Sequence, residues 1–514
     1  MKNQLKRVRV MFLTLSVFFC IAVFHAFGEF NPVLAADKFY KGSPPAKYIF
    51  FFIGDGMGIP QRTAAEMYRK KRLLIDTFPA QGITTTYAAD RFITGSAAAS
   101  TALSSGQKTN IGMIGMAPDQ RQVSTIAEMA RDMGMKVGIV SSVSIDHATP
   151  AAFYAHFPKR SQYYDIALAL VESNFDFFGG GGLKDPTDKK KKSKSYKGDA
   201  YEIIKRSGYK IVTNKSDLMG LKPGEGKIFA RNARLPDGNA LPYAIDMTPE
   251  DITLCELTAK AIELLENPKG FFLMVEGGKI DWACHANDAT AAIEDTIAFD
   301  QAAQEAVDFY KRHPHDTLIV VTADHECGGL TLGFAGTEYA SYFEVLRNQN
   351  ISFQKFSDEV LKTYKEGCKG NCKFEDVKPM ITKHFGLKFV GNPKEDRLVL
   401  EDYQIKVLRE AYLRSLLSEK VESKGPLTSL LYGRYEPLTV SITRLLNNKA
   451  GLGWTSFKHT GVPVSTSAMG LGAEIFNGYY DNTDVALKIM SVMGISPKVH
   501  FAEHQDRQRL ASGN

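Results

Sequence analysis

Three short apolar runs of the chain are each followed by side chains that could bind a divalent metal ion. They are residues 48–53 followed by Asp55, residues 271–275 followed by Glu276, and residues 318–322 followed by Asp324 and His325. Zinc accepts both carboxylate and imidazole ligands. Any one of these side chains alone could be a turn or capping residue. The threefold repetition predicts a metal site where several strands end.

A second candidate metal-binding pair is formed by Asp281 and His285, which lie four residues apart. Positions i and i+4 share one face of a helix, so both side chains could bind the same cation. Such pairs also occur on ordinary helix surfaces. Its position five residues after Glu276, just beyond a predicted strand, favours the metal-binding interpretation.

Ser96 is the candidate nucleophile because it lies among small residues, in the sequence Thr-Gly-Ser-Ala-Ala-Ala-Ser-Thr-Ala of residues 94–102. Small neighbours leave room for a tetrahedral phosphate, and a helix beginning near Ser96 would favour an anion there. A hydroxyl needs a base or a metal for activation, and no base is near in the sequence. We therefore expect metal activation. The alternative is that these small residues only allow tight helix packing.

The elements that must position these residues alternate along the chain. Further apolar runs occupy residues 137–140 and 175–178, and helical spacing is seen at residues 123–133, 253–265 and 289–310. Doubly buried strands alternating with helices predict an α/β fold, with a mostly parallel central sheet flanked by helices. Two segments interrupt the pattern and are predicted insertions, residues 184–245 and the helical residues 337–450.

Residues 1–35 have the pattern of a secretory signal peptide, and residues 36–514 are predicted to form the catalytic domain. Four basic residues precede an apolar run at 11–27, and Val33 and Ala35 supply small residues before a cleavage point. The alternative is an uncleaved anchor, because the run is near the minimum length for spanning a bilayer. We expect cleavage, no stable membrane anchor, and a periplasmic or secreted protein.

Five cysteines remain after residue 35, and export would place them in an oxidising compartment. Cys368 and Cys372 are predicted to form a short disulfide loop. The odd total leaves at least one thiol free or paired with another chain.

The basic balance of the chain does not indicate nucleic-acid recognition. Removing residues 1–35 lowers the formal net charge from +6 to +3. The lysine run at 189–192 has few aromatic neighbours and is typical of a solvated loop.

Taken together, these motifs resemble the alkaline phosphatase family. The correspondence extends from about Tyr48 to Gly336, resumes near His459 and leaves out most of the two predicted insertions. The matching motifs, in the family's order, are residues 51–58, 94–102, 147–152, 276–285, 322–326 and 459–461. The resemblance implies hydrolysis of phosphate monoesters through a covalent phosphoserine, with release of inorganic phosphate. Family members are often dimers, so a homodimer is possible by analogy.

The resemblance also assigns roles to individual residues. It implies one zinc ion on Asp281, His285 and His459, a second on Asp55, Asp324 and His325, and a magnesium ion on Asp55, Thr149 and Glu276. Arg160 would bind the phosphate, because a guanidinium can reach two phosphate oxygens at once. Ser96 would carry the phosphoryl group.

Three positions depart from the pattern of many family members. Gly95 stands where many have an aspartate that pairs with the phosphate-binding arginine, so Arg160 would lack that partner. His147 and Trp282 replace an aspartate and a lysine of some bacterial members. His147 would bind the third metal or only contact its ligands, which leaves the identity of that metal open. Trp282 removes a positive charge near the phosphate.

Other functions remain to be weighed against this interpretation. A sulfatase needs proline and arginine at fixed positions after its nucleophile, whereas alanines follow Ser96. A phosphodiesterase with the same fold stays open, because the insertions shape substrate access. A noncatalytic metal- or phosphate-binding protein would be expected to lack the nucleophile or a metal ligand, and the sequence contains all of them.

Overall fold

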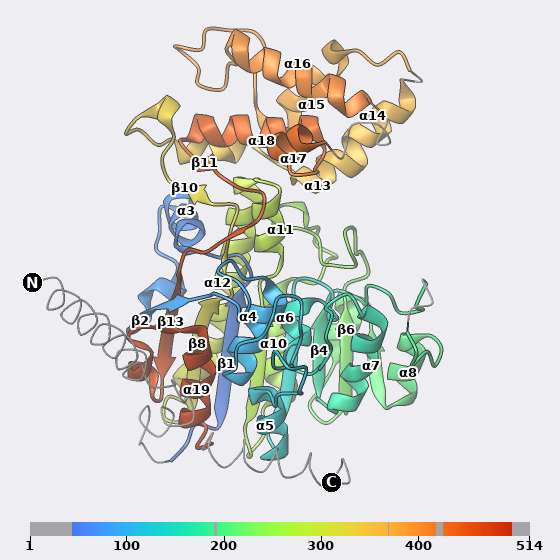
Figure 1. The fold of residues 1–514 in the computed structure, drawn as a ribbon, viewed down its shortest axis with the longest axis vertical. Helices are drawn as coiled ribbons and strands as arrows, with labels where there is room; N and C mark the ends of the chain where they lie inside the picture. Colours follow the sequence, from blue (N-terminus) through green and yellow to red (C-terminus); the bar gives the residue numbers. More distant parts are fainter. Residues whose placement is uncertain (1–43, 190–192, 369, 418–424, 496–514) are drawn as a thin grey trace, which may run out of the picture.

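A ten-stranded sheet with the strand order β14-β2-β13-β8-β1-β7-β3-β4-β6-β5 forms the centre of the protein. The computed structural model describes residues 44–189, 193–368, 370–417 and 425–495, and Figure 1 shows their arrangement. The strands are β1 Tyr48–Gly54, β2 Ala80–Thr85, β3 Lys136–Ser141, β4 Phe177–Gly180, β5 Tyr209–Val212, β6 Lys227–Arg231, β7 Phe271–Glu276, β8 Thr317–Ala323, β9 Glu326–Cys327, β10 Leu330–Thr331, β11 Gly453–Trp454, β12 His459–Thr460, β13 Val464–Gly470 and β14 Gly478–Asp481.

Helices cover both faces of this sheet and build a separate layer beyond its edge (Figure 1). They are α3 Ile59–Arg69, α4 Ser96–Ser105, α5 Ile126–Asp132, α6 Ala148–Ala151, α7 Tyr163–Ser173, α8 Ala200–Arg206, α9 Lys215–Gly220, α10 Leu254–Leu265, α11 Lys279–His285, α12 Ala289–Arg312, α13 Phe353–Lys355, α14 Lys362–Gly367, α15 Phe374–Phe385, α16 Asp402–Leu416, α17 Pro426–Tyr432, α18 Pro437–Ala450 and α19 Asn482–Val492.

The sheet is mostly parallel, which confirms the predicted fold class. Strand β13 is the exception and runs antiparallel to both β2 and β8. Every residue of β1 is buried, and its side chains alternate between two hydrophobic clusters. Phe50 and Phe52 belong to the cluster that includes α10 and α12, whereas Phe51 and Ile53 belong to the cluster with α5 and α19. An apolar run without polar alternation therefore forms a strand covered on both faces.

The carboxyl ends of the central strands lie in register with one another. Ile53 of β1 is opposite Glu276 of β7, and Gly54 is opposite Ala323 of β8. Ser141 of β3 is also opposite Glu276. The polar residues that follow these strands consequently meet at a single edge of the sheet.

The described residues of the segment 337–450 fold mainly as helices α13–α18, which form the layer at the top of Figure 1. Two buried carboxylates of the main body accept hydrogen bonds from residues 349–353, at the start of this helical layer. Asp288 accepts hydrogen bonds from the Gln349 amide and the Phe353 N–H, and Asp246 accepts one from the Ser352 N–H. The helical layer is thus joined to the main body by polar bonds as well as apolar packing.

Residues 184–245 contribute two strands to the main sheet. Strands β5 and β6 pair with each other in parallel, and β6 pairs with β4. The segment therefore extends the sheet at one end, with the short helices α8 and α9 in its connections.

The structure pairs Cys368 with Cys372, whose Cα atoms lie 5.1 Å apart, and this confirms the predicted disulfide. Cys255, Cys284 and Cys327 are free thiols. The predicted signal peptide lies outside the described residues. Among the residues that are described, none of the helices has the length and apolar character needed to span a bilayer.

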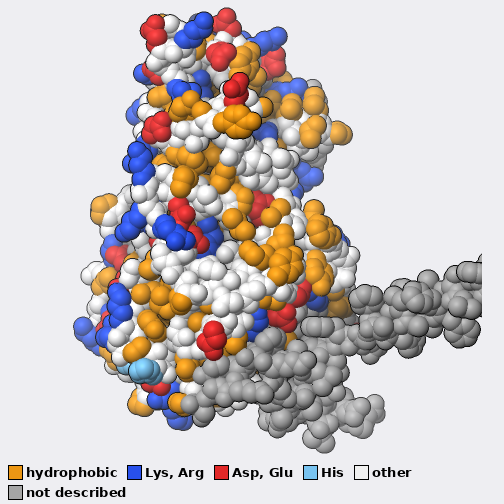
Figure 2. All heavy atoms as spheres, turned by 90° about the vertical axis from the view of Figure 1, so that its left-hand side faces the viewer, with side chains coloured by type: hydrophobic (Ala, Val, Ile, Leu, Met, Phe, Trp, Pro, Cys, Tyr) orange, Lys and Arg blue, Asp and Glu red, His pale blue; other side chains and the backbone are white. Residues whose placement is uncertain are grey.

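The surface carries both signs of charge. Figure 2 shows lysine and arginine side chains scattered among acidic ones on one face, without a continuous basic surface there. That face gives no support to nucleic-acid binding.

Candidate active site

Ser96 is the first residue of α4 and is 2% exposed. Gly95 before it has an extended backbone, and no side chain caps the helix, so the first N–H groups of α4 have no side-chain partner. Free N–H groups and the helix dipole favour an anion at this position. All ten residues of α4 are buried, so the small residues after Ser96 also serve close packing. Both interpretations of this motif are therefore compatible.

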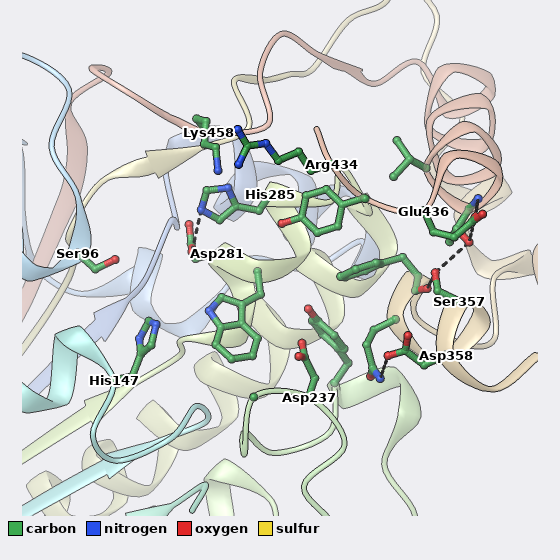
Figure 3. A pocket seen from close by; sticks show the side chains of 18 of the residues that line it. Ser96, His147, Asp237, Asp281, His285, Ser357, Asp358, Arg434, Glu436 and Lys458 are labelled. Atoms are coloured by element: carbon green, nitrogen blue, oxygen red, sulfur yellow. Dashed lines mark hydrogen bonds and ion pairs between the residues drawn. The ribbon is translucent and has the colours of Figure 1, made fainter. Parts of the chain in front are cut away.

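Asp281 and His285 lie on α11, and His459 on β12 faces them (Figure 3 labels the first two). The Nε2 atoms of the two histidines are 3.1 Å apart. The Nδ1 atom of His285 lies 2.7 Å from the Phe457 carbonyl oxygen, and that of His459 lies 3.0 Å from the Thr94 carbonyl oxygen. Each Nδ1 must carry a proton to donate to its carbonyl, so in the neutral rings both Nε2 lone pairs face each other.

A cation bound by both nitrogens would remove the repulsion between their two lone pairs. The carboxylate of Asp281 lies 3.3 Å from Nε2 of His285 and 3.6 Å from Nε2 of His459. One carboxylate and two imidazoles, each imidazole oriented by a backbone carbonyl, form a donor set that suits zinc.

Asp55, Asp324 and His325 come together beside Ser96. Nε2 of His325 lies 3.2 Å from Asp324, 3.5 Å from Asp55 and 3.5 Å from Ser96 Oγ. Asp55 Oδ1 and Asp324 Oδ2 are buried without a hydrogen-bond partner in the described structure. Two unpartnered carboxylate oxygens beside an imidazole nitrogen can hold a divalent cation next to the serine oxygen.

Glu276 forms a third group with Asp55, Thr149 and His147. The Thr149 hydroxyl donates to Asp55 over 3.4 Å, and Ser141 donates to Glu276. One candidate ligand atom each from Asp55, His147 and Glu276 lies within 4.8 Å of the others. Both interpretations of His147, as a ligand or as a neighbour of the ligands, therefore remain compatible with this geometry.

Three buried carboxylates of this region, those of Asp55, Asp324 and Glu276, lack sufficient positive charge among the side chains around them. Burial, reinforced by the nearby acids Asp324, Asp281 and Glu276, raises the pKa of Asp55 well above its usual value. Burial raises the pKa of Asp324 to about 8, and burial also raises the pKa of Glu276 to about 7. Divalent cations would compensate these charges, so the residues present fit the metals that the resemblance implies.

Gly56 allows the loop after β1 to approach α11. Its φ is 71°, in the left-handed region, and an added Cβ would lie 2.8 Å from the Asp281 Cα. The Gly56 N–H donates to Asp324 Oδ1 over 3.1 Å. A glycine is required here because any side chain would displace Asp281.

Arg160 lies at the same site and donates from Nη2 to His147 Nε2 over 3.0 Å. Its backbone N–H donates to the Gly112 carbonyl oxygen. Trp282 packs its ring edge against His147, with ring centroids 5.7 Å apart. The structure thus gives Arg160 a histidine partner, whereas Gly95 offers none.

These groups open into a pocket of about 570 Å³ (Figure 3). Ser96, Arg160 and His147 line its inner end, and the helical layer lines its outer end with Phe353, Ser357, Arg434 and Tyr435, among others. The nucleophile candidate is therefore reached through a cleft between the main body and the helical layer.

Sequence reasoning missed several residues of this region. Glu326 accepts hydrogen bonds from Gln61 and from Thr460, which is adjacent to His459. Cys327 lies opposite His459 in the β9–β12 pair, and burial raises the pKa of its thiol. Their positions one and two residues after His325 were the available signal. The outer residues 353–358 and 434–440 have no motif that could have identified them.

Comparisons with known proteins agree with this geometry. The family model described as alkaline phosphatase matches residues 46–384. Alkaline phosphatase 4 of Bacillus subtilis is 31% identical over 464 residues, covering 87% of this chain and 88% of that protein. Alkaline phosphatase 3 of the same organism is 31% identical, covering 91% and 94%.

The solved structure of a cold-active alkaline phosphatase from Shewanella sp. superposes with a TM-score of 0.70. It is 28% identical in sequence, with 87% of this chain and 99% of that chain covered. The family match spans more than half of the chain, and the Bacillus proteins match over nearly their whole length. The chain therefore belongs to the alkaline phosphatase family and is a phosphomonoester hydrolase.

Proposed function

We propose that Ser96 is the nucleophile of this phosphatase and carries the phosphoryl group as a covalent phosphoserine. The observation that supports it best is the position of Ser96. Its hydroxyl stands at an uncapped helix N-terminus, 3.5 Å from His325, and Asp55 and Asp324 lie close to the same His325 nitrogen. A phosphate bound there would be stabilised by the α4 N–H groups as well as by cations.

Two zinc ions and one magnesium ion are the proposed cofactors. Asp281, His285 and His459 would hold one zinc, Asp55, Asp324 and His325 the other, and Asp55, Thr149 and Glu276 the magnesium. Zinc at these positions would lower the pKa of a bound hydroxyl and stabilise both the attacking and the leaving oxygen of an in-line displacement. The facing nitrogens of His285 and His459 support the first assignment.

The remaining side chains would orient the substrate. Arg160 would turn from His147 toward two phosphate oxygens, and its fork would fix the phosphorus opposite Ser96 Oγ. Burial, together with the cation of Arg160, holds the pKa of His147 well below its usual range. His147 is consequently neutral and can accept the arginine hydrogen bond when no phosphate is bound.

The decisive experiment measures hydrolysis of p-nitrophenyl phosphate alongside metal analysis of the purified protein. We expect steady turnover that a chelator abolishes and zinc restores. The Ser96→Ala variant should lose at least about a thousandfold in kcat while it keeps its fold and its metals. Full activity of Ser96→Ala would refute the covalent mechanism. Faster turnover of bis(p-nitrophenyl) phosphate than of the monoester would favour the diesterase alternative.

Export and a homodimer are also part of this proposal. The basic and apolar residues of 1–35 support export, and the Cys368–Cys372 disulfide suits an oxidising compartment. Amino-terminal sequencing of protein secreted from cells tests cleavage near residue 35. Sedimentation equilibrium of the mature protein tests the dimer.

A further inference from the structure

The outer end of the active-site pocket carries two cationic side chains, Arg434 and Lys458. Arg434 lies in the connection between α17 and α18 of the helical layer, and Lys458 immediately precedes His459. Both line the same pocket as Ser96, and Figure 3 shows them on one side of it, beyond His285. Both side chains are solvent-exposed at the pocket mouth.

The backbone at Arg434 adopts an uncommon conformation. Gly433 and Arg434 have φ values of 60° and 74°, so two successive residues are left-handed. Glycine adopts this region freely, but for arginine it carries a conformational cost. Non-glycine residues in this region concentrate at binding sites, where surrounding contacts hold them. The strained residue is the one whose side chain reaches the pocket.

Contacts with Phe457 fix this connection relative to the predicted zinc ligands. A Cβ on Gly433 would lie 2.3 Å from the Phe457 ring. The ring of Tyr435 packs against the same Phe457 ring, with 6.4 Å between the ring centroids. The carbonyl oxygen of Phe457 accepts the hydrogen bond from His285 Nδ1. Arg434 and Lys458 are therefore positioned on the His285 side of the pocket.

Two acidic residues of the outer pocket, Glu436 and Asp237, are paired with lysines, whereas Asp358 accepts a hydrogen bond from a neutral amide. Glu436 accepts from the Thr439 N–H and forms an ion pair with Lys365 at 3.2 Å. Asp358 accepts from the Gln354 amide, and Asp237 lies 3.9 Å from the Lys279 ammonium.

The cations of the outer pocket are not balanced in this way. Within the described residues, neither Arg434 nor Lys458 has a side-chain hydrogen bond or an ion pair. The ammonium of Lys184, on the His147 side, lies 5.0 Å from the centroid of the Tyr163 ring. Among the described residues, the charges of Arg434 and Lys458 are thus not compensated by an ion pair and are available to an anion that enters the pocket.

We propose that Arg434 and Lys458 bind a second anionic group, a carboxylate or a phosphate, on the alcohol that leaves the phosphate ester. This inference rests on the proposed function, because it assumes that the ester is cleaved at Ser96 with the alcohol toward His285. The enzyme would then prefer phosphate monoesters of anionic alcohols over those of neutral alcohols of the same size. The guanidinium fork suits a planar oxyanion, and the lysine adds a point charge.

The test compares three substrates of one shape, namely 4-carbamoylphenyl, 4-carboxyphenyl and 4-phosphonophenyl phosphate. Their distal groups are respectively neutral, a carboxylate and a phosphonate that cannot be hydrolysed. The change in kcat/KM between variant and wild type removes differences in intrinsic reactivity. Arg434→Asn removes the cation, and asparagine tolerates the left-handed backbone.

We expect Arg434→Asn and Lys458→Gln each to lower kcat/KM for an anionic substrate about 5- to 10-fold relative to the neutral one. The anionic substrate, carboxylate or phosphonate, whose kcat/KM falls more in the variants identifies the class of the natural anion. Arg434→Lys should retain part of the preference. Lys362→Gln, an exposed lysine of the same helical layer outside this pocket, is the matched control and should leave all three substrates unchanged.

Equal losses for neutral and anionic substrates, or no loss for either, would overturn the inference while leaving the phosphatase assignment intact. Absence of p-nitrophenyl phosphate hydrolysis by the wild-type protein would instead refute the proposed function itself. The two failures are therefore distinguishable.

Discussion

Arg160 and His147 are joined by a hydrogen bond of 3.0 Å between Nη2 and Nε2. The Trp282 ring packs edge to face against the ring of His147. Arginine orientation at this site therefore depends on a neutral ring and its aromatic support, since Gly95 cannot supply a carboxylate. A neutral partner holds an arginine more weakly than a carboxylate does, so we predict that Arg160, as the proposed phosphate ligand, favours release of phosphate over its retention.

Replacing Trp282 should change how tightly the product binds. Trp282→Lys places an ammonium near the phosphate, and we expect the inhibition constant of inorganic phosphate to fall about 5- to 10-fold. Competitive inhibition of p-nitrophenyl phosphate hydrolysis measures it. Trp282→Phe keeps an aromatic ring without a charge and serves as the control. A lysine variant that binds phosphate no more tightly than the phenylalanine variant would contradict the prediction.

Glu326 is expected to position His459 through Thr460. The Thr460 hydroxyl and the Gln61 amide both donate to this carboxylate, which is 1% exposed. Glu326→Gln removes the charge and replaces one accepting oxygen by an NH2 group that can only donate. The affinity for zinc should therefore fall about 10- to 100-fold. Competition with a chromophoric chelator measures the affinity directly, without relying on turnover. Thr460→Ser keeps the hydroxyl and should retain zinc. Unchanged affinity in Glu326→Gln would show that the His459 strand holds its position unaided.

His156 and Glu128 form a partly buried pair near the loop that precedes Arg160. Nε2 of His156 lies 2.9 Å from Glu128, and Nδ1 lies 2.7 Å from the Gly115 carbonyl oxygen. Burial opposes the charged form of both groups, but their hydrogen bond and attraction outweigh it. The pKa of His156 is consequently raised, and the pKa of Glu128 is lowered.

The direction of these shifts gives a pH dependence. The contribution of His156 is complete below its unfolded pKa of about 6.5 and is lost as pH rises through the raised folded value. The contribution of Glu128 is complete above about pH 4.5 and is lost as pH falls through its lowered value. His156→Gln should therefore lower the free energy of unfolding by about 1–3 kcal/mol at pH 6 and by less at pH 9. Urea unfolding of the zinc-loaded protein at both pH values tests this, and an equal loss at both would contradict it.

Asp288 should be important for joining the helical layer to the main body. It caps α12 through the Ala291 N–H and accepts bonds from Gln349 and Phe353. Asp288→Ala leaves these donors unpaired, and the free energy of unfolding should fall by about 2–4 kcal/mol. Thermal denaturation monitors the loss. Asp402→Ala, an exposed position on α16, is the comparison and should change stability little. A stability of Asp288→Ala no lower than that of Asp402→Ala would refute this role.

Much of the candidate site could be predicted because its ligands follow strands. Asp55, Glu276 and Asp324 each come directly after an apolar run, and parallel strands place such residues at one edge. Helix α5 shows how local signals also fix boundaries. It begins at Ile126 rather than Val123, because Thr125 and Glu128 form a capping box.

The sequence by itself determined the local features of this protein, namely the buried strands, the spacing of Asp281 and His285, and the small residues around Ser96. These depend on interactions between residues a few positions apart. The family resemblance implied that His285 and His459 bind one zinc, but only the tertiary structure brought their Nε2 atoms together and brought Arg434 from the helical layer to the pocket. Those meetings depend on packing between segments far apart in the chain, and no local pattern of residue types encodes that packing.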